Sequence, residues 1–243
     1  MSNWDEVALP DGWELRGVEE TDSTNDEIRR RGMAKHGLVA VAERQTAGRG
    51  RRGAAWLSNP GESLTFSVML RPDGPKTLWS RLSLAAGLAV AEALETCGIE
   101  ARIKWPNDVL VGTKKICGIL VEAVGDHVIV GIGLNVGSKS FPEGLKATSI
   151  LLETGREWGR PEVMGMILRS LSGWSGEIEK GFPNLIVRIQ ERCALSGEKV
   201  RLMSGDRMVE GRVAGIGMAG ELLLETEQGQ ECFLQAHEVR LCD

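Results

Sequence analysis

Residues 48–53 alternate arginines and glycines, a composition suited to binding anions. The glycines let backbone N–H groups approach a ligand closely, and Arg49, Arg51 and Arg52 lie between them. Guanidinium groups held in place can grip a phosphate and a carboxylate together. The segment therefore predicts a loop that binds such groups. A flexible, solvated basic loop is the alternative.

The same segment has the G-x-G-x-x-G spacing of dinucleotide-binding loops. That fingerprint requires a preceding strand, a helix that begins in the loop and an acidic residue about 20 positions later. A strand is expected at residues 38–43, but Pro60 and Gly61 leave no room for a normal helix. Asp73 has the right distance yet lies in a Pro/Gly turn. We therefore reject a Rossmann site.

The segment Lys104-Trp-Pro-Asn-Asp108 places polar groups directly after an expected strand. Pro106 sets a turn, and Asn107 and Asp108 present an amide and a carboxylate where the chain leaves it. Taken alone, the segment is better explained as a tight turn that ends a strand. The lysine before it and the lysine pair at 114–115 favour a site.

Two further strand ends carry polar groups. Lys115 precedes an apolar strand that starts at Gly118, where its ammonium can neutralise a buried carboxylate or remain a solvated hairpin charge. The segment Gly131-Ile-Gly-Leu-Asn135 ends the next strand with two glycines and an amide. Glycines weaken a strand, so their presence here indicates that a ligand or another backbone comes close. A β-bulge is the alternative explanation for them. Ser23-Thr-Asn25 is typical of a helix cap.

Hydrophobic periodicity predicts the elements that position these residues. We expect a helix at residues 24–35, with Thr24 and Glu27 as a capping box. Gly98 should end a second helix at 77–97. A third amphipathic helix is expected at 162–180, and a short one should end near Arg192. The expected strands span residues 38–43, 63–70, 101–104, 118–124 and 127–132.

The pattern changes near residue 194. Short strand candidates separated by turn signals follow at 198–203, 208–216, 221–227, 231–235 and 238–241. Five short strands in about 50 residues predict a small closed barrel rather than an open sheet. We therefore expect a first domain at residues 1–193 and a second domain at 194–243.

Composition narrows the class of protein. The 243 residues are 42% hydrophobic, and 29 basic against 34 acidic side chains give a net charge of −5. A general affinity for DNA or an anionic membrane is not expected. The N-terminus lacks a signal-peptide pattern, and the longest apolar run, residues 82–91, is too short to span a bilayer. Five scattered cysteines predict a reducing cytoplasm, and three distant histidines predict no dedicated metal site.

Taken in order, the motifs resemble the biotin–protein ligase family, also described as biotin–[acetyl-CoA-carboxylase] ligases. They are S-T-N, Q-x-A-G-R-G-R-x-G-x-x-W, K-W-P-N-D, K-K-x-x-G-I-L-V-E, G-I-G-x-N and A-T-S. The resemblance covers nearly the whole chain and is strongest from residue 22 to 150. It implies an α/β (α+β) fold, in which a mixed sheet flanked by helices forms a class II synthetase-like catalytic domain. A C-terminal SH3-like β-barrel would follow.

The resemblance also implies a role for each motif residue. The biotin-binding residues would be Ser23, Thr24, Asn25, Gln45, Arg49, Gly50, Arg51, Lys115 and Gly118. Those serving ATP would be Arg49, Arg51, Trp56, Lys104, Asn107 and Asn135. The catalytic set would be Arg51, Lys104, Asp108 and Lys115. One position departs from the pattern, because the family often has arginine where Ala54 stands.

The implied reaction joins biotin to ATP, with Mg²⁺, as biotinoyl-AMP. The biotinyl group then passes to a lysine of a biotin carboxyl carrier protein, such as an acetyl-CoA carboxylase subunit. Converging cations would offset the repulsion between carboxylate and phosphate, and the Gly/Arg loop would close as a lid that excludes water. No nucleic-acid or membrane partner is expected. Both a monomer and a homodimer remain open.

Three other functions compete with this one. A lipoate or octanoate ligase would share the fold. A biotin-responsive repressor would need a helix-turn-helix domain, and the 22 residues before Ser23 are too few for one. A nucleotide-sensing module would bind without turnover. We therefore expect the monofunctional ligase without a DNA-binding domain.

Overall fold

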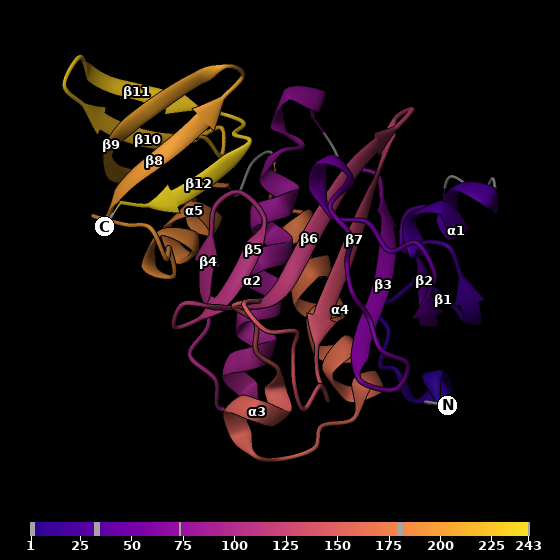
Figure 1. The fold of residues 1–243 in the computed structure, drawn as a ribbon. Helices are drawn as coiled ribbons and strands as arrows, with labels where there is room; N and C mark the ends of the chain where they lie inside the picture. The colour runs from indigo at the N-terminus through magenta and orange to yellow at the C-terminus, as the bar shows by residue number, and fades with distance from the viewer. Residues whose placement is uncertain (1–2, 32–34, 73, 179–181, 243) are drawn as a thin grey trace.

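The computed structural model describes residues 3–31, 35–72, 74–178 and 182–242. A seven-stranded mixed sheet has the order β1-β2-β3-β7-β6-β5-β4, and a five-stranded antiparallel sheet lies beside it (Figure 1). Among the described strands of the larger sheet, only β1 and β2 pair in parallel. Its strands are β1 (Glu14–Thr21), β2 (Leu38–Gln45), β3 (Ser63–Leu70), β4 (Arg102–Lys104), β5 (Asp108–Val111), β6 (Lys114–Val124) and β7 (His127–Asn135).

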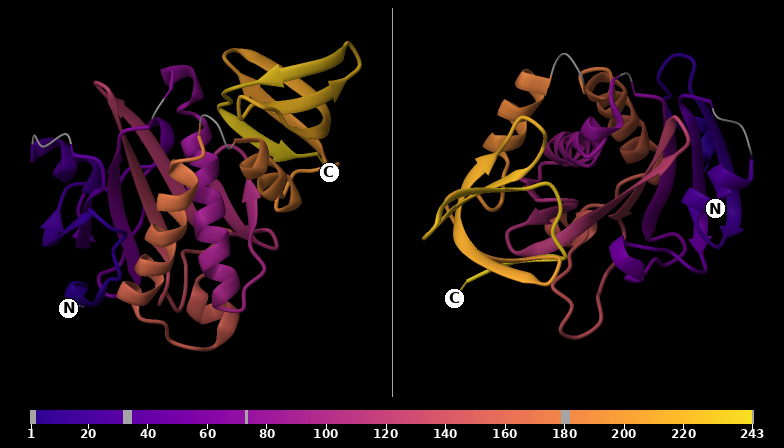
Figure 2. Two further views of the ribbon diagram at one scale, coloured as in Figure 1. Left: turned by 180° about the vertical axis from the view of Figure 1, so that it is seen from behind. Right: turned by 90° about the horizontal axis from the view of Figure 1, so that it is seen from above.

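Helices cover the two faces of this sheet unequally. Two long helices, α2 (Arg81–Thr96) and α4 (Arg160–Ser175), lie side by side on one face (Figure 2). The short helix α1 (Thr24–Arg30) contacts β2, β3 and β7, and the remaining helices are α3 (Ile150–Thr154) and α5 (Phe182–Glu191). No helix in these ranges is long and apolar enough to cross a membrane.

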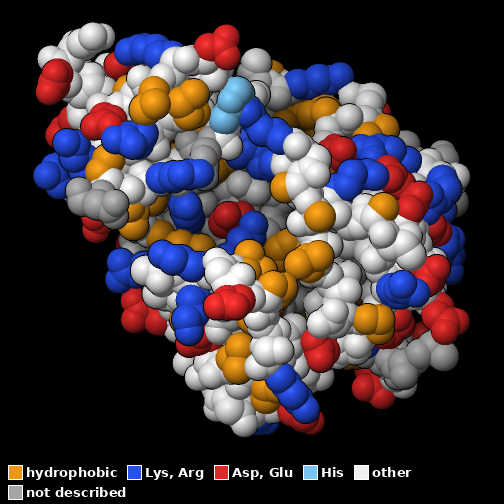
Figure 3. Space-filling view, in the orientation of Figure 1, with side chains coloured by type: hydrophobic (Ala, Val, Ile, Leu, Met, Phe, Trp, Pro, Cys, Tyr) orange, Lys and Arg blue, Asp and Glu red, His pale blue; other side chains and the backbone are white. Residues whose placement is uncertain are grey.

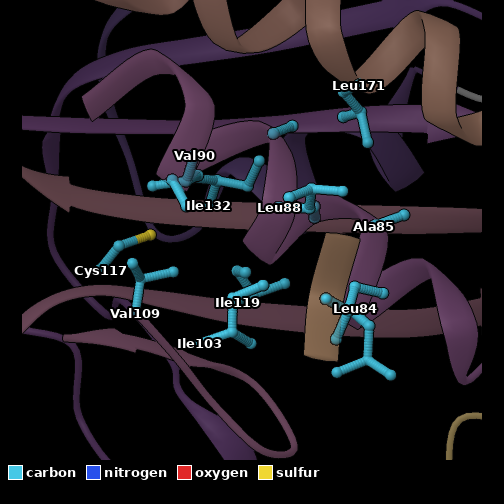
Figure 4. Close-up of a cluster of buried hydrophobic side chains, with 14 of the residues drawn as sticks. Leu84, Ala85, Leu88, Val90, Ile103, Val109, Cys117, Ile119, Ile132 and Leu171 are labelled. Atoms are coloured by element: carbon cyan, nitrogen blue, oxygen red, sulfur yellow. The ribbon is translucent and has the colours of Figure 1, made fainter. Parts of the chain in front are cut away.

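The core lies between α2 and the sheet. Leu84 and Leu88 of α2 pack near Ile103, Ile119 and other buried side chains of the strands (Figure 4). Every residue of β3 is buried, as expected for a central strand covered on both faces. On the opposite face α1 packs against β3, and β6 and β7 beside it are left free to form a site.

Most sequence-predicted elements are confirmed, with altered ends. Strand β3 matches its predicted range, whereas β1, β5 and α3 were not predicted. Helix α2 begins at Arg81 rather than at residue 77, because a separate 3-10 turn (Lys76–Leu78) precedes it. Helix α4 ends at Ser175, and residues 179–180 of its predicted range lie outside the described residues.

The predicted capping box at Thr24 is wrong. Ser23 is the N-cap of α1, and Thr24 is already the first helical residue. The Thr24 hydroxyl faces Gln45 and Ser67 instead of its own helix. The helix ends at Arg30, and residues 32–34 of its predicted range to residue 35 lie outside the described residues.

The five predicted C-terminal strands are present as β8 (Lys199–Ser204), β9 (Arg207–Ile216), β10 (Leu222–Thr226), β11 (Gly229–Phe233) and β12 (Glu238–Leu241). They form a curled sheet in the order β11-β10-β9-β8-β12 (Figure 1). The described strands β11 and β12 end this order without pairing to each other, so hydrogen bonding does not close the predicted barrel. Strand β11 pairs with β10, and β12 pairs with β8. The sheet therefore curls without its two ends meeting.

One turn of the small sheet is anchored to the larger body. Ser80 Oγ donates to the carbonyl of Ala219 (3.3 Å), and Trp105 Nε1 donates to that of Gly220 (2.9 Å). Arg81 donates to the carbonyl of Met218 and stacks over Phe182 of α5. Through Trp105, the anchor holds the C-terminal sheet against the start of the Trp105–Asp108 turn.

Candidate active site

A cavity of about 220 Å³ opens beneath α1 on the face of β6 and β7. Figure 3 shows a hollow near the middle of the molecule, with Lys and Arg side chains around it and an acidic side chain inside. The cavity collects most of the predicted site residues, namely Ser23, Thr24, Asn25, Gln45, Arg49, Gly50, Arg51, Trp56, Asn107, Asp108, Lys115 and Gly118.

The end of the cavity beneath α1 is polar. The backbone N–H of Thr24 donates to Gln45 Oε1 (2.8 Å), which turns the Gln45 amide nitrogen away from it. No described residue accepts from that nitrogen, and the Ser23 hydroxyl makes no capping bond. Gln45 and Ser23 therefore retain hydrogen-bonding capacity for a ligand.

The glycines of β6 and β7 make room for side chains. A Cβ atom at Gly131 would lie 2.4 Å from Asn25 Oδ1, and one at Gly133 would lie 2.3 Å from Trp56 Cε2. Gly118 pairs with Gly133 across the ladder, and its Cβ would also meet the Trp56 ring, at 3.0 Å. The predicted close approach is thus real, but the approaching groups are side chains from α1 and the Gly/Arg loop.

A bulge in β6 turns Lys115 toward the cavity. In a regular strand, residues three apart point to opposite faces, which would separate Lys115 from Gly118. Here Val109 pairs with Cys117 and Leu110 with Lys115, so Ile116 is the extra residue and Lys115 changes face. Its ammonium lies 2.7 Å from Asp108 Oδ1 and 5.6 Å from the centre of the Trp56 ring.

The Trp105–Asp108 turn is fastened to β6. Asn107 Nδ2 donates to the carbonyl of Ile119, and the N–H of Ile119 donates to the carbonyl of Asn107, both at 2.9 Å. Asp108 begins β5 opposite Gly118, which places its carboxylate at the cavity wall. Lys104 pairs with Asp108 across β4 and β5 and does not line the cavity.

Arg49 fastens the Gly/Arg loop to α1. Its guanidinium donates two hydrogen bonds to the carboxylate of Asp26, at 2.6 and 2.8 Å. These bonds, with help from Arg29, lower the pKa of Asp26 below its ordinary value of 3.8. Two parallel charge-assisted bonds of this kind are strong and orient the loop.

Arg51 extends from the same loop into a different environment. Its guanidinium donates to the backbone carbonyl of Ala236 (3.1 Å) and approaches Asn107 Oδ1 (3.5 Å). Burial, together with Arg52, lowers the pKa of Arg51 below its ordinary value. No carboxylate of the described residues forms an ion pair with Arg51. A partly buried cation of this kind favours an anionic ligand.

A second cavity, of about 380 Å³, adjoins the first. Trp56, Ala55 and Lys115 line both cavities, and apolar side chains such as Phe141, Pro142 and Leu145 line the second. Asn135 also lines it, with its amide nitrogen bound to the carbonyl of Thr148 (2.9 Å). The predicted site residues thus divide between two adjoining cavities, and Lys104 lines neither.

Four residues at the site were not predicted from sequence. Asp26 holds Arg49, and Ser67 and Glu122 bind the side chains of Thr24 and Asn25. His237 lines the cavity from the C-terminal sheet. Glu122 ends the K-K-x-x-G-I-L-V-E motif, and that position is a usable signal. The others contact the site across more than 20 residues of chain and have no local signature.

Comparison with known proteins agrees with this geometry. Residues 17–135 match the model of the Biotin/lipoate A/B protein ligase family. A relative in Mycobacterium tuberculosis named Biotin--[acetyl-CoA-carboxylase] ligase is 35% identical over 229 residues, covering 90% of this chain and 86% of the relative. The Bifunctional ligase/repressor BirA of Bacillus spizizenii is 36% identical over 207 residues, covering 81% of this chain. The match spans only 64% of that relative's length.

Solved structures give the same result. The biotin protein ligase from Aquifex aeolicus, in complex with biotin and ATP, superposes with a TM-score of 0.86 at 36% identity. The match covers 94% of this chain and 99% of that one. The sequence matches and the shared fold together show that the chain belongs to the biotin/lipoate A/B protein ligase family.

Proposed function

We propose that the protein activates biotin with ATP and transfers the biotinyl group to a lysine of a biotin carboxyl carrier protein. The observation that carries this proposal is the sequence of environments along the two adjoining cavities. A polar end at Thr24 and Gln45 leads to a cationic centre at Arg51 and Lys115, and then to the apolar cavity beside Asn135. This order matches the ring, the acyl phosphate and the adenosine of biotinoyl-AMP.

Each part of the ligand meets suitable groups in this arrangement. The ureido ring carries two N–H groups and one carbonyl, which the polar groups of Ser23, Thr24 and Gln45 can satisfy. The adenine would enter the apolar cavity near Asn135. Trp56 separates the two ends, and its buried Nε1–H, which lacks a partner among the described residues, is available to a ligand oxygen.

The first reaction step joins two anions. The biotin carboxylate attacks the α-phosphorus of ATP, and pyrophosphate leaves. Arg51 and Lys115 would reduce the repulsion and stabilise the charge that develops at the phosphorus. Mg²⁺ would enter as the ATP complex and shield the phosphates. Arg49 is already bonded to Asp26, so we assign it to holding the loop closed over the mixed anhydride.

The second step transfers the acyl group to the acceptor. The lysine nitrogen attacks the acyl carbon, AMP leaves, and the nitrogen loses a proton. Asp108 lies at the cavity wall and can accept a hydrogen bond from the incoming amine once Lys115 is engaged with the ligand. Gly50 and Gly118 would keep the backbone close to the reacting groups.

We further propose a division near residue 194, with residues 1–193 as the catalytic domain and 194–243 as a second domain. The seven strands of the larger sheet precede that point and the five strands of the smaller sheet follow it, which supports the division. The scattered cysteines support a cytoplasmic location.

Biotin-dependent exchange of pyrophosphate into ATP tests the first step. Purified protein should catalyse this exchange with biotin and Mg²⁺ but not with lipoate. Transfer to an apo carrier domain, followed by mass spectrometry, tests the second step. No exchange with biotin, or equal exchange with lipoate, would overturn the proposal.

A further inference from the structure

Beneath the polar end of the cavity lies a chain of hydrogen bonds that the site residues themselves do not explain. Ser67 is fully buried in the middle of β3 and does not line the cavity. Its hydroxyl oxygen lies 2.5 Å from Asn25 Oδ1 and 2.7 Å from Thr24 Oγ1. On the other side, Asn25 Nδ2 lies 2.5 Å from Glu122 Oε2. The chain therefore runs from Glu122 to the cavity wall.

The direction of each hydrogen bond follows from the carboxylate. An ionised Glu122 can only accept, so it must face the amide nitrogen of Asn25. The amide oxygen then faces Ser67 and can only accept as well. A serine hydroxyl has one hydrogen, and the contact with Asn25 takes it. Gly131, opposite Ser67 in the ladder, leaves the space in which Asn25 Oδ1 lies.

The remaining hydrogen belongs to Thr24. Two hydroxyl oxygens 2.7 Å apart need a hydrogen between them. Since Ser67 has none left, Thr24 must donate to it. Thr24 Oγ1 also lies 3.2 Å from Gln45 Oε1, which already accepts the backbone N–H of Thr24. With its hydrogen directed at Ser67, Thr24 presents lone pairs on the Gln45 side.

We propose that Ser67 and Glu122 are positioning residues that set the hydrogen-bond polarity of the ring-binding end. Through Asn25, they make Thr24 Oγ1 and Gln45 Oε1 a pair of acceptors that can hold a ligand N–H between them. The inference rests on the proposed function, because the ureido ring of biotin supplies such an N–H. It adds two residues that do not touch the ligand yet determine which groups the ligand meets.

The removal of the Ser67 hydroxyl breaks this chain at its centre. In Ser67→Ala, Thr24 is free to turn its hydrogen toward Gln45 and so to compete with the ligand N–H. A ligand hydrogen bond lost or opposed in this way is expected to raise the KM for biotin about tenfold. The kcat of pyrophosphate exchange and the KM for ATP should change less than about twofold, because the cationic centre is untouched.

Thr65→Val is the matched control. Thr65 lies on the same face of β3, is buried like Ser67, and pairs with Gly133 as Ser67 pairs with Gly131. Its hydroxyl bonds only to the carbonyl of Ala42 among the described contacts. The two variants should lose similar thermal stability, and only Ser67→Ala should raise the KM for biotin.

Glu122 tests the chain from its other end. Glu122→Leu removes the acceptor that orients Asn25 and should reproduce the KM effect of Ser67→Ala. Glu122→Gln keeps an oxygen that can accept from Asn25, so it should bind biotin nearly as well as wild type, even though the ion pair with Arg29 (2.9 Å) is lost. Titration calorimetry with biotin gives the same comparison without turnover.

Several results would overturn the inference. These are a KM for biotin in Ser67→Ala that matches Thr65→Val, an effect confined to kcat, or equal damage from Glu122→Gln and Glu122→Leu. If wild-type protein is active with biotin, such results reject only the positioning role of Ser67 and Glu122. If wild-type protein shows no exchange with biotin, the proposed function is rejected, and the positioning role that rests on it is rejected too. If Ser67→Ala does not fold, the comparison of Glu122→Gln with Glu122→Leu tests the inference instead.

Discussion

Replacing Lys115 by methionine should separate the function of this residue from its contribution to folding. The Lys115 ammonium is 2.7 Å from Asp108 Oδ1, and the two side chains are 35% and 25% exposed. A pair this accessible to water contributes about 1 kcal/mol or less to stability. For a chain of this size we expect Tm to fall by no more than about 2–4 °C.

The expected effect on ligand binding is larger. A charge-assisted hydrogen bond to the biotin carboxylate or the acyl phosphate contributes about 1.5–3 kcal/mol, which corresponds to about 10–150-fold in kcat/KM for biotin. Methionine keeps the length of the side chain, so packing against Trp56 is largely retained. The measurement is pyrophosphate exchange over a range of biotin concentrations, together with thermal unfolding.

Lys114→Met provides the control. Lys114 is adjacent in sequence, exposed, and does not line the cavity. The Lys114→Met variant should have kinetics and thermal stability close to those of wild type. If Lys115→Met shows the same kinetics as Lys114→Met, the reasoning is refuted and Lys115 is only a charge at the end of a hairpin.

A double variant distinguishes two explanations of a loss. In Lys115→Met, the Asp108 carboxylate is left unpaired at the cavity and repels an anionic ligand. If neutralising Asp108 is the only task of Lys115, the additional change Asp108→Asn should restore the KM for biotin. If Lys115 contacts the ligand, the loss should persist in the double variant.

Four further predictions address the loop, the glycines, the core and pH. Arg51→Gly removes the contacts with Asn107 and the Ala236 carbonyl, so biotinoyl-AMP should escape and label albumin faster than wild type does. Labelling no faster than wild type, with adenylate still formed, would show that Arg51 does not hold the lid. Gly133→Ala should displace the Trp56 ring, since its Cβ would lie 2.3 Å from Cε2, and change tryptophan fluorescence. Gly137→Ala, whose nearest atom is 3.6 Å away, should not change it, and equal spectra would reject the assigned packing. Arg160→Met removes the positive charge that lies 2.6 Å from Glu43, a carboxylate that is only 10% exposed. The free energy of unfolding should fall by about 3–5 kcal/mol and Tm by roughly 6–20 °C. A fall in Tm of less than about 3 °C would contradict this account. The lowered pKa of Asp26 means that its pair with Arg49 stabilises the fold above the ordinary value of 3.8 and is lost as pH falls below it. Tm should therefore fall less steeply below about pH 4 in Asp26→Asn than in wild type, and parallel curves would refute the assignment.

Local sequence was sufficient to predict the features that depend on residues close together in the chain. Strand β3 was predicted to the residue because Leu64, Phe66 and Val68 alternate with small polar residues, and a Pro/Gly turn closes the strand. The order of the motifs, through the family that they resemble, named most of the residues that line one cavity. Strand β1 escaped prediction because its polar composition reflects an edge position, with β2 as its only partner strand.

Tertiary structure decided how those residues are used. The bulge at Ile116, which turns Lys115 into the cavity, depends on the register that β6 adopts against β5. The two glycines of β7 serve Asn25 and Trp56, which are distant in the chain, and a local pattern does not specify what approaches a glycine. Ser67 and Glu122 meet the residues of α1 only after the sheet has formed, across 42 and 97 positions of sequence. Hydrogen-bond polarity at the site is therefore a property of the assembled sheet and helix, because each donor is oriented by an acceptor on a different element.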